Sequence, residues 1–570
     1  MNQPSPAIVA QGSVRRLPRP ALLLFCLAYL LPGFIDRMPW RSADITAFGY
    51  MAELARGGTD WFAPRLMGIP PDVDALLPYW LGAWALQLAP SWVPPDLAAR
   101  IPFIALLALT FVAIWQGIYY LARSPQAQPV AFAFGGEALA PDYARAMADG
   151  GLLAFIACLG LAQLSHETTP AQAQLCFTAL SFYAVAALPY RQLLPAIAAA
   201  AGLLGLTFSG GPWMAVLLGG GSAAIHLLDK RSAAQGRSQH RRGLRLLVGL
   251  TVLAAALATM LNLWHWRIAL PAPSWPVWQG LGTLLLWFTW PAWPLVLWTL
   301  WRWRRQVLNT HLSRHLALPL WFALITVGAT LITPAGDRAL LLALPALATL
   351  AAFALPTLER SISALIDWFT LIFFTSCALI IWVVWIAMLT GFPPQPAANV
   401  ARLAPGFEPR FVILPFLFAT LATLAWAWLV KWRAGRHRAA IWKSLVLPAG
   451  GAALCWLLLT TLWMPLLDHA RSYAPLVQRV EAVVKPTNCL ETFGLSRGLL
   501  TAFRFHSDLR LEPASDSAHC QWLVVDRDIV TDIPEIVSPV YWTRHSSLGH
   551  PREGEEEIVI YQRLAGKNGP

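Results

Sequence analysis

Residues 36–80 read DRMPWRSADITAFGYMAELARGGTDWFAPRLMGIPPDVDALLPYW, and they follow the first apolar run of membrane length. The interval holds six acidic residues, several prolines and a set of Trp, Tyr and Phe side chains. It is too polar to cross a lipid bilayer and more aromatic than a plain spacer, as segments at a membrane interface are. We therefore expect a long loop at the water–lipid boundary, and its carboxylates are the first place to look for chemistry.

The composition around this loop is that of a helical membrane protein. Of 570 residues, 57% are hydrophobic, only 13% are charged and 29 are Trp. Apolar runs of about 17–25 residues, the length that crosses roughly 30 Å of hydrocarbon, recur along the chain. We predict an all-α polytopic membrane protein with about thirteen transmembrane helices, near 21–38, 99–122, 149–165, 171–188, 191–208, 211–228, 245–265, 277–300, 316–333, 339–356, 365–390, 410–430 and 445–467.

Four clusters of Lys and Arg predict the orientation of these helices. Thirteen spans place all four clusters on one side, and positive loops are typical of the cytoplasmic side. We therefore predict a cytoplasmic N-terminus in a bacterial inner membrane, with loop 36–80 and the tail after 467 in the periplasm. The first span has no small-residue cleavage site and is expected to be a retained anchor. A nucleic-acid patch is the competing interpretation, but no soluble fold surrounds the clusters, which are 11–19, 230–245, 301–315 and 431–443.

The sequence divides into a membrane domain, 1–467, and a soluble domain, 468–570. In the latter, PLVQRVEAVV and LSRGLLTAFRF have helical spacing, whereas CLETFGL, QWLVVDRD and EEEIVIYQRL are typical of strands. This alternation predicts a small periplasmic α/β domain. Cys489 and Cys520 are the two cysteines of this polar tail, and an oxidising compartment favours a disulfide between them, although two unpaired thiols are the alternative. No Cys/His motif for zinc is present.

Within loop 36–80, the apolar residues of ITAFGYMAELA recur at helical spacing and stop at a Gly pair. We expect an amphipathic helix on the membrane surface. Asp44 falls at its N-cap or first turn, where backbone N–H groups favour an anion, so a helix cap is the simplest interpretation of this residue. Trp80 and Trp84 in the following segment are typical of interfacial anchors.

Taken in succession, Asp44, the surface helix, TDWFAPRLMGIP and LLPYW resemble the first periplasmic loop of the polyprenyl-phosphate-dependent GT-C glycosyltransferases. The most similar subgroup contains the protein O-mannosyltransferases and the bacterial enzyme that adds aminoarabinose to lipid A. PAGDRALLLALPALATLAAF (334–353) resembles a further helix of this family, with Arg338 at the matching basic position. The overall layout is similar as well, so the resemblance implies a GT-C fold.

The resemblance also implies an activity. A sugar would move, with inversion, from a polyprenyl-phosphate donor to a lipid, glycan or protein acceptor in the periplasm, among membrane lipids and without nucleic acid. Asp44 would act as general base on the acceptor hydroxyl. Arg65, Arg338 and Arg56 are the candidates for binding the donor phosphate, and ordinary interfacial arginines are the alternative. The resemblance requires no cofactor and leaves room for a divalent metal.

The second acidic motif of the family can be placed in two ways. Local likeness favours Arg145 and Asp149, in YARAMADGGLLAF. The predicted topology puts that segment inside and favours His166 and Glu167, in the next outer loop. We prefer His166 and Glu167, because a periplasmic reaction cannot use a cytoplasmic carboxylate. An ordinary polar loop cap remains the alternative for this pair.

Three positions depart from the family pattern. Ile45 follows Asp44 where a Glu is usual, Asp74 stands where a Lys is usual, and SGGPW (209–213) lacks the Lys that normally precedes its Gly-Pro. The missing cations motivate a second hypothesis, a non-catalytic GT-C relative that binds polyprenyl-phosphate lipid or scaffolds envelope glycan assembly. A transporter is the third hypothesis, disfavoured because the spans hold few ionisable residues and no matched broken helices.

Overall fold

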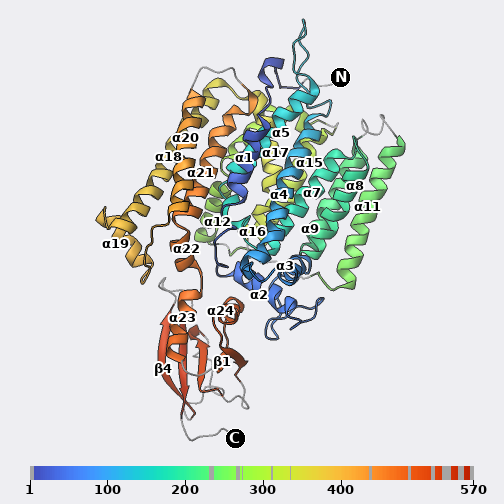
Figure 1. Cartoon of the computed structure of the whole chain (residues 1–570). Coiled ribbons are helices and arrows are strands. Elements are labelled where there is room, and N and C mark those ends of the chain that lie inside the picture. The colour runs from blue at the N-terminus through green and yellow to red at the C-terminus, as the bar shows by residue number, and fades with distance from the viewer. Residues whose placement is uncertain are drawn as a thin grey trace.

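The structure is a computed structural model, and it describes residues 5–229, 237–264, 270–272, 274–309, 312–333, 336–434, 440–484, 489–514, 520–528, 541–549 and 557–564. Most of the described chain forms a bundle of apolar helices, and a small sheet domain stands at one end of it (Figure 1). The bundle helices are α1 (Arg19–Leu30), α4 (Pro95–Ala122), α5 (Ala140–Ala157), α7 (Pro170–Ala187), α8 (Leu193–Phe208), α9 (Pro212–Leu228), α11 (Arg237–Met260), α12 (Trp275–Phe288), α13 (Ala292–Arg302), α15 (Arg314–Ile332), α17 (Leu344–Ala354), α18 (Arg360–Thr390), α20 (Ile413–Ala434) and α21 (Val446–Leu462).

The chain is a multi-pass helical membrane protein. Within the described ranges, six helices are long and apolar enough to cross a bilayer, or up to seven if a bent pair counts as one span. Shorter apolar helices such as α8 and α9 add to these. Each predicted span overlaps one or two of the bundle helices, while the count of thirteen stays a prediction, because several of these helices are shorter than a membrane crossing requires.

One predicted span, 277–300, is sharply bent in its middle. Helices α12 and α13 share this stretch and meet at an angle of 85°. The break lies at Thr289–Pro291, where the proline removes a backbone donor from the helical ladder. Apolar content alone could not reveal the bend, because the helices on both sides of it are apolar.

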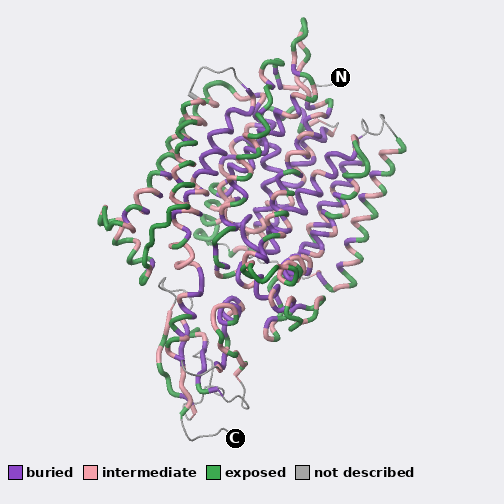
Figure 2. Tube along the Cα trace, viewed as in Figure 1, coloured by how far each residue is buried: buried purple, intermediate pink, exposed green. Residues whose placement is uncertain are grey.

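Burial divides the bundle into a core and a lipid-facing rim. Helices α5, α7, α17 and α21 are buried over most of their lengths, whereas α11, α12, α18 and α20 have many exposed residues (Figure 2). Large apolar side chains are among these exposed residues. Exposed leucines and tryptophans are unfavourable in water but are the expected contact with hydrocarbon. The rim is therefore the surface that faces lipid.

Short helices connect the bundle. They are η1 (Gln11–Ser13), α2 (Ala43–Ala55), α3 (Leu77–Leu88), α6 (Leu161–Leu164), α14 (Arg304–Val307), α16 (Gly336–Leu341), η2 (Leu355–Thr357), α19 (Pro394–Leu403), η3 (Ile441–Leu445) and α22 (Met464–Arg471). Helix α2 is the helix predicted within loop 36–80, but it does not lie on an open surface. It packs against α3, and helix α24 of the sheet domain covers it, so most of its residues are buried.

The sheet domain contains helices α23 (Ala474–Val484) and α24 (Arg497–His506) and a five-stranded sheet in the order β2-β1-β3-β5-β4. The strands are β1 (Cys489–Phe493), β2 (Arg510–Pro513), β3 (Trp522–Asp526), β4 (Trp542–Gly549) and β5 (Glu557–Arg563). Strand β1 is parallel to β2 and β3, whereas β5 is antiparallel to β3 and β4. Both predicted helices and all three predicted strands are present; β2 and β4 are additional.

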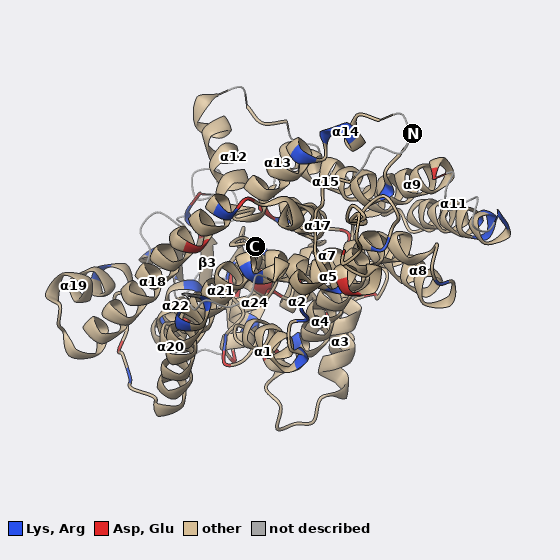
Figure 3. Ribbon diagram, turned by 90° about the horizontal axis from the view of Figure 1, so that it is seen from above, with Lys and Arg blue, Asp and Glu red and all other residues tan. Residues whose placement is uncertain are grey.

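The first described residues and the sheet domain lie at opposite ends of the bundle (Figure 1). Seen from the N-terminal end, basic residues mark the ends of α11, α13 and α14 (Figure 3). Parts of three predicted basic clusters, 230–236, 310–311 and 435–439, lie outside the described residues. The charge pattern agrees with the predicted orientation, and the sidedness of the membrane stays a prediction.

Candidate functional site

Asp44 lies in the first turn of α2, as predicted, but it does not cap that helix. One carboxylate oxygen, Oδ2, accepts hydrogen bonds from Arg37 Nη2 at 2.5 Å and from the Trp40 N–H at 3.2 Å. The other, Oδ1, accepts from both the N–H and the hydroxyl of Thr168, at 2.8 and 2.7 Å. The carboxylate therefore ties the start of α2 to the loop between α6 and α7.

The Arg37–Asp44 ion pair is almost completely buried, with 0% and 2% of the two side chains exposed. Burial by itself raises the pKa of the Asp44 carboxyl, but the positive charges of Arg37 and Arg100 lower it. The two hydrogen bonds from Thr168 lower it further, and the net pKa is below the usual value. Asp44 is therefore held as a carboxylate.

Glu167 is the second carboxylate of the cluster, and its surroundings have the opposite effect. Burial raises its pKa, the negative charge of Asp44 adds to this effect, and Arg338 opposes it. Arg338 Nη2 donates to Glu167 Oε2 at 3.3 Å, and Gln163 Nε2 donates to Oε1 at 3.0 Å. Two neighbouring carboxyl groups whose pKa values are driven apart are a pattern of acid–base sites.

His166 precedes Glu167 but belongs to the packing. Its ring is fully buried among Tyr29, Phe34 and Trp456, with ring centroids 4.7 to 5.6 Å away. The ring nitrogens face the carbonyls of Ala162 and Tyr29. Burial lowers the pKa of His166 to about 4, so the ring is neutral near pH 7.

Arg145 and Asp149 lie far from this cluster. Arg145 pairs with Asp142 at 3.5 Å, and Asp149 accepts a hydrogen bond from Trp115 at 2.8 Å. Trp115 is fifteen residues along α4 from Arg100, which is roughly 22 Å of helix. The geometry therefore favours Glu167 as the partner of Asp44, which agrees with the preferred placement.

The three predicted phosphate-binding arginines are separated. Arg338 belongs to the cluster and keeps 29% of its side chain exposed. Arg65 is exposed and donates to the Gly68 carbonyl within its own loop. Arg56 is also exposed and caps the far end of α2, twelve residues and roughly 18 Å from Asp44. The structure brings only Arg338 to the two carboxylates.

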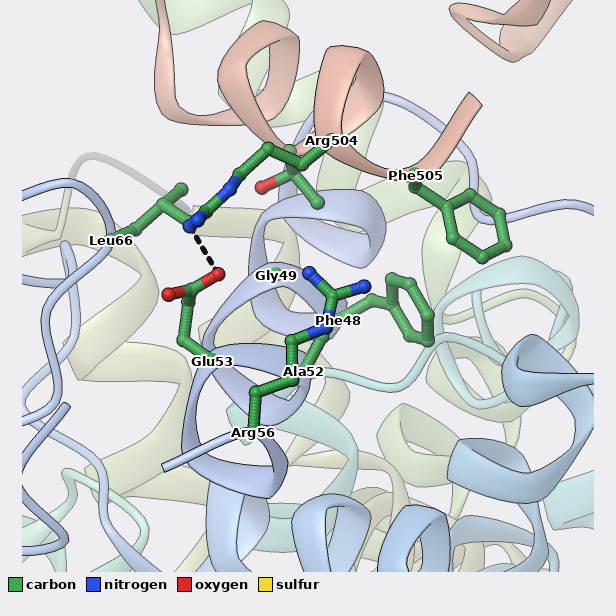
Figure 4. A pocket seen from close by; sticks show the side chains of 9 residues that line it. Phe48, Gly49, Ala52, Glu53, Arg56, Leu66, Arg504 and Phe505 are labelled. Carbon is green, nitrogen blue, oxygen red and sulfur yellow. Dashed lines mark hydrogen bonds and ion pairs between the residues drawn. The ribbon is translucent and has the colours of Figure 1, made fainter. Parts of the chain in front are cut away.

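At the far end of α2, a shallow hollow opens between this helix and α24. Figure 4 shows Glu53 of α2 and Arg504 of α24 directed toward each other. Arg56, at the end of α2, lines the same hollow, as do Phe48 and Phe505. Glu53 and Arg504 form an ion pair. This contact joins the first loop to the sheet domain.

The two positions without the family's lysines lie next to each other. A Cβ atom built on Gly210 would come within 2.5 Å of Val73 Cγ1 and 3.5 Å of the Asp74 carbonyl carbon. The Leu76 N–H also donates to the Phe208 carbonyl, at 2.7 Å. The tight backbone approach of these two segments leaves little room for a lysine at Gly210.

Cys489 and Cys520 form a disulfide with a Cα–Cα distance of 5.3 Å. Together with Glu512 they are the one group of three potential metal ligands that the described residues bring together. The disulfide uses both sulfur atoms, so only a carboxylate is left there.

Sequence reasoning missed Arg37, Arg100 and Thr168. Arg100 is 2% exposed and pairs with Asp96 at 2.9 Å, one helical turn away. Its signal was present, because a cation within a predicted apolar span is unfavourable without a partner. Arg37 and Thr168 carried no comparable signal, since charged and hydroxyl residues are ordinary in loops.

No protein-family model matches this chain, and no curated protein sequence matches it. Among solved structures, it resembles the crystal structure of ArnT from Cupriavidus metallidurans bound to undecaprenyl phosphate, with a TM-score of 0.60 and 14% sequence identity, over 97% of this chain and 100% of that one. The structure of the same protein in the apo state gives a TM-score of 0.59 and 13% identity, over 95% and 98% of the two chains. The fold that the resemblance of loop 36–80 implied is therefore confirmed, and this chain has an ArnT-like architecture over nearly its whole length.

Proposed function

We propose that this protein is an integral membrane glycosyltransferase of the bacterial inner membrane. It moves a sugar from a polyprenyl-phosphate donor to a periplasmic or lipid-linked acceptor. In this proposal the N-terminus is cytoplasmic, residues 1–467 form the membrane domain, and residues 468–570 form a periplasmic domain.

One observation carries the proposal: two buried carboxylates and three arginines converge where the bundle meets loop 36–80. Asp44 and Glu167 supply the carboxylates, and Arg37, Arg100 and Arg338 supply the cations. A cluster of this kind can remove a proton from a hydroxyl and stabilise a departing phosphate. The fold supports the same activity, since the similar ArnT structure holds undecaprenyl phosphate.

Asp44 is the proposed general base, and its surroundings suggest how an acceptor would reach it. Thr168 Oγ1 donates to Asp44 Oδ1 at 2.7 Å, which is the hydrogen bond that an acceptor hydroxyl would make. The acceptor hydroxyl would replace that of Thr168, give its proton to Asp44 and attack the anomeric carbon. The bond from that carbon to the phosphate oxygen then breaks, and polyprenyl phosphate leaves.

Arg338 is the proposed contact for the leaving phosphate, because it is the partly exposed cation of the cluster. Its Nε has no hydrogen-bond acceptor in the described part of the chain. The same holds for Arg37 Nε and Nη1, which lie deeper. An anion that reaches the cluster would meet these donors, and the charge-assisted hydrogen bonds would be strong.

The test uses the full chain in lipid nanodiscs with radiolabelled pentoses and hexoses on undecaprenyl phosphate and an extract of envelope lipids as acceptors. We expect transfer by the wild type and a loss on the order of 10²–10⁴-fold in Asp44→Asn. Asp60→Asn is the control, because Asp60 is exposed in the same loop and, within the described ranges, accepts only a local hydrogen bond from the Phe62 N–H. Full transfer by Asp44→Asn would exclude Asp44 as the base.

The alternative is a relative that binds the lipid without transferring the sugar. Its supporting observation is that the Asp44 carboxylate accepts four hydrogen bonds from protein groups, which is about the acceptor capacity of its two oxygens. The missing lysines at Asp74 and SGGPW support it as well. Saturable binding of undecaprenyl phosphate by the wild type, without turnover of any donor in the panel, would favour this alternative.

A further inference from the structure

Helix α22 joins the last bundle helix to the sheet domain, and it also contacts the candidate site. Asp468 on this helix accepts a hydrogen bond from Trp40 Nε1 at 2.7 Å. Its two carboxylate oxygens also share the Met38 N–H, each at 3.3 Å. These contacts join two segments that lie more than 420 residues apart in the chain. The segment 37–41 is therefore fastened to α22.

Segment 37–41 in turn fixes the position of the Asp44 carboxylate. The Trp40 N–H donates to Asp44 Oδ2 at 3.2 Å, and the Arg41 N–H donates to the Arg471 carbonyl at 2.9 Å. Two guanidinium groups lie over the Trp40 ring, Arg37 at 4.5 Å and Arg471 at 4.9 Å from the ring centroid. Such cation–π contacts strengthen when they are desolvated. Movement of α22 would thus move Trp40 and the partners of Asp44.

Arg471 makes a second connection, to the other carboxylate. Its Nη1 donates to Gln163 Oε1 at 2.5 Å, and Gln163 Nε2 donates to Glu167 Oε1 at 3.0 Å. The remaining oxygen of Glu167 accepts from Arg338. The amide of Gln163 is thereby oriented by Arg471, because its oxygen faces the guanidinium and its nitrogen faces Glu167.

We propose that α22 positions both carboxylates of the site, with Asp468 acting on Asp44 through Trp40 and Arg471 acting on Glu167 through Gln163. The role in catalysis rests on the proposed glycosyl transfer. The two residues are positioning residues, because each reaches a carboxylate through another side chain, Trp40 or Gln163. A displacement of about 1 Å at a catalytic group can cost on the order of 10²-fold in rate, so this support matters for turnover. It also couples the sheet domain, through α22, to the reaction centre.

The experiment combines kinetics with hydrogen–deuterium exchange on the full chain in nanodiscs. The variants are Asp468→Ala, Asp468→Asn, Arg471→Ala and Gln163→Ala. Asp468→Asn retains an oxygen that can accept from Trp40 and serves as the conservative rescue. His469→Ala is the matched control on α22, since His469 contacts only the Pro405 carbonyl among the hydrogen bonds of the described residues.

We expect kcat to fall by roughly 10-fold to 100-fold in Asp468→Ala and Arg471→Ala, with KM for the donor changed less than about twofold. Asp468→Asn should recover most of the rate, and His469→Ala should match the wild type. The double variant Arg471→Ala with Gln163→Ala should lose little more than Arg471→Ala, because the two residues act in series. Amide exchange should accelerate in 38–41 for Asp468→Ala, and in both 38–41 and 161–168 for Arg471→Ala.

Equal kcat in Asp468→Ala, Arg471→Ala and the wild type would overturn the proposal and leave α22 as a tether. A loss in His469→Ala as large as in the other variants would overturn it as well. If the wild type transfers no sugar, the proposed function is wrong, but hydrogen–deuterium exchange still tests whether α22 positions segments 38–41 and 161–168. Unchanged exchange of both segments in Arg471→Ala would then refute the positioning by itself.

Discussion

The two ends of helix α2 carry the same chemical pair, a carboxylate and an arginine, in very different surroundings. At the N-terminal end, Asp44 and Arg37 have 2% and 0% of their side chains exposed. At the C-terminal end, Glu53 and Arg504 have 8% and 36% exposed. The first pair is also held by Thr168 and Trp40, whereas the second pair lies at the edge of a hollow.

Burial makes the loss of one charged partner much more costly at the N-terminal end of α2 than at its C-terminal end. A buried ion pair is strongly destabilising when one partner is removed, because the other charge is left without solvent. A partly exposed pair contributes little, since water screens both partners. The N-terminal end of α2 is therefore the region where charge is retained at a cost, as is common at functional sites.

The largest expected effect is at Arg37. Arg37→Met leaves Asp44 buried without its ion-pair partner, and we expect a loss of about 3–5 kcal/mol in the free energy of unfolding. Denaturant unfolding in detergent micelles measures it. The double variant Arg37→Met with Asp44→Leu should recover part of the loss, and Arg65→Met, at an exposed site, should cost little. A loss below about 1 kcal/mol in Arg37→Met would contradict the proposed difference between the two ends.

The second largest effect on stability is expected at the contact between α2 and α24. A Cβ atom on Gly49 would lie 2.1 Å from Thr501 Oγ1 and 3.0 Å from its Cβ. Gly49→Ala should therefore push α24 away and cost about 1–3 kcal/mol. Adding Thr501→Ala removes the nearest atoms, so the double variant should be more stable than the sum of the two single changes predicts. Strict additivity would show that the helices separate freely.

The stability of the folded protein should also depend on pH through a group near the buried N-terminal end of α2. His166 has a pKa of about 4 in the folded protein against an ordinary 6.5, because burial disfavours the charged ring. The unfolded chain therefore binds more protons between these values, and the folded state loses stability as pH falls from 6.5 toward 4. Between pH 7.5 and pH 5.5 the contribution of His166 to this loss is on the order of 1 kcal/mol. The Tm of His166→Asn should fall less over this interval than the Tm of the wild type. Parallel plots of Tm against pH for the two proteins would show that His166 does not cause the loss.

The smallest effect is expected at the C-terminal end of α2. Glu53→Gln leaves the partly exposed Arg504 in contact with water, and we expect at most about 1 kcal/mol. Arg504→Gln should cost more than Glu53→Gln, because it leaves the more buried partner charged. Denaturant unfolding of both variants measures this asymmetry. A cost for Glu53→Gln equal to that of Arg37→Met would erase the distinction between the two ends.

Much of the fold was predictable, because lipid imposes a strong pattern on sequence. Long apolar runs marked the bundle helices, and the spacing of apolar residues marked α2, α23 and α24. The bend between α12 and α13 was not predictable, because the hydrophobicity of a segment does not indicate the direction of its helix axis. The burial of α2 was missed for a related reason: its cover, α24, lies about 450 residues away, and local periodicity cannot reveal such a partner.

The candidate site was predictable only where a family pattern existed. Asp44 and Arg338 came from the GT-C resemblance, and Glu167 came from the argument on membrane sides; the structure brings these three into one cluster, while their catalytic roles stay proposals. Arg37 and Asp468 came from neither. Their roles depend on which loop residues meet in space, and a single sequence does not contain that information.

The junction at α22 has a consequence for how this protein can be divided. The predicted boundary at 467/468 falls immediately before Asp468, whose hydrogen bonds hold Met38 and Trp40. A membrane domain ended at 467 would leave these donors without their acceptor, and a separately produced tail would carry the acceptor away. The two domains thus differ in architecture but are joined by these hydrogen bonds. An exchange of sheet domains between related proteins should therefore place its crossover before α22 and transfer segment 37–41 together with the sheet domain.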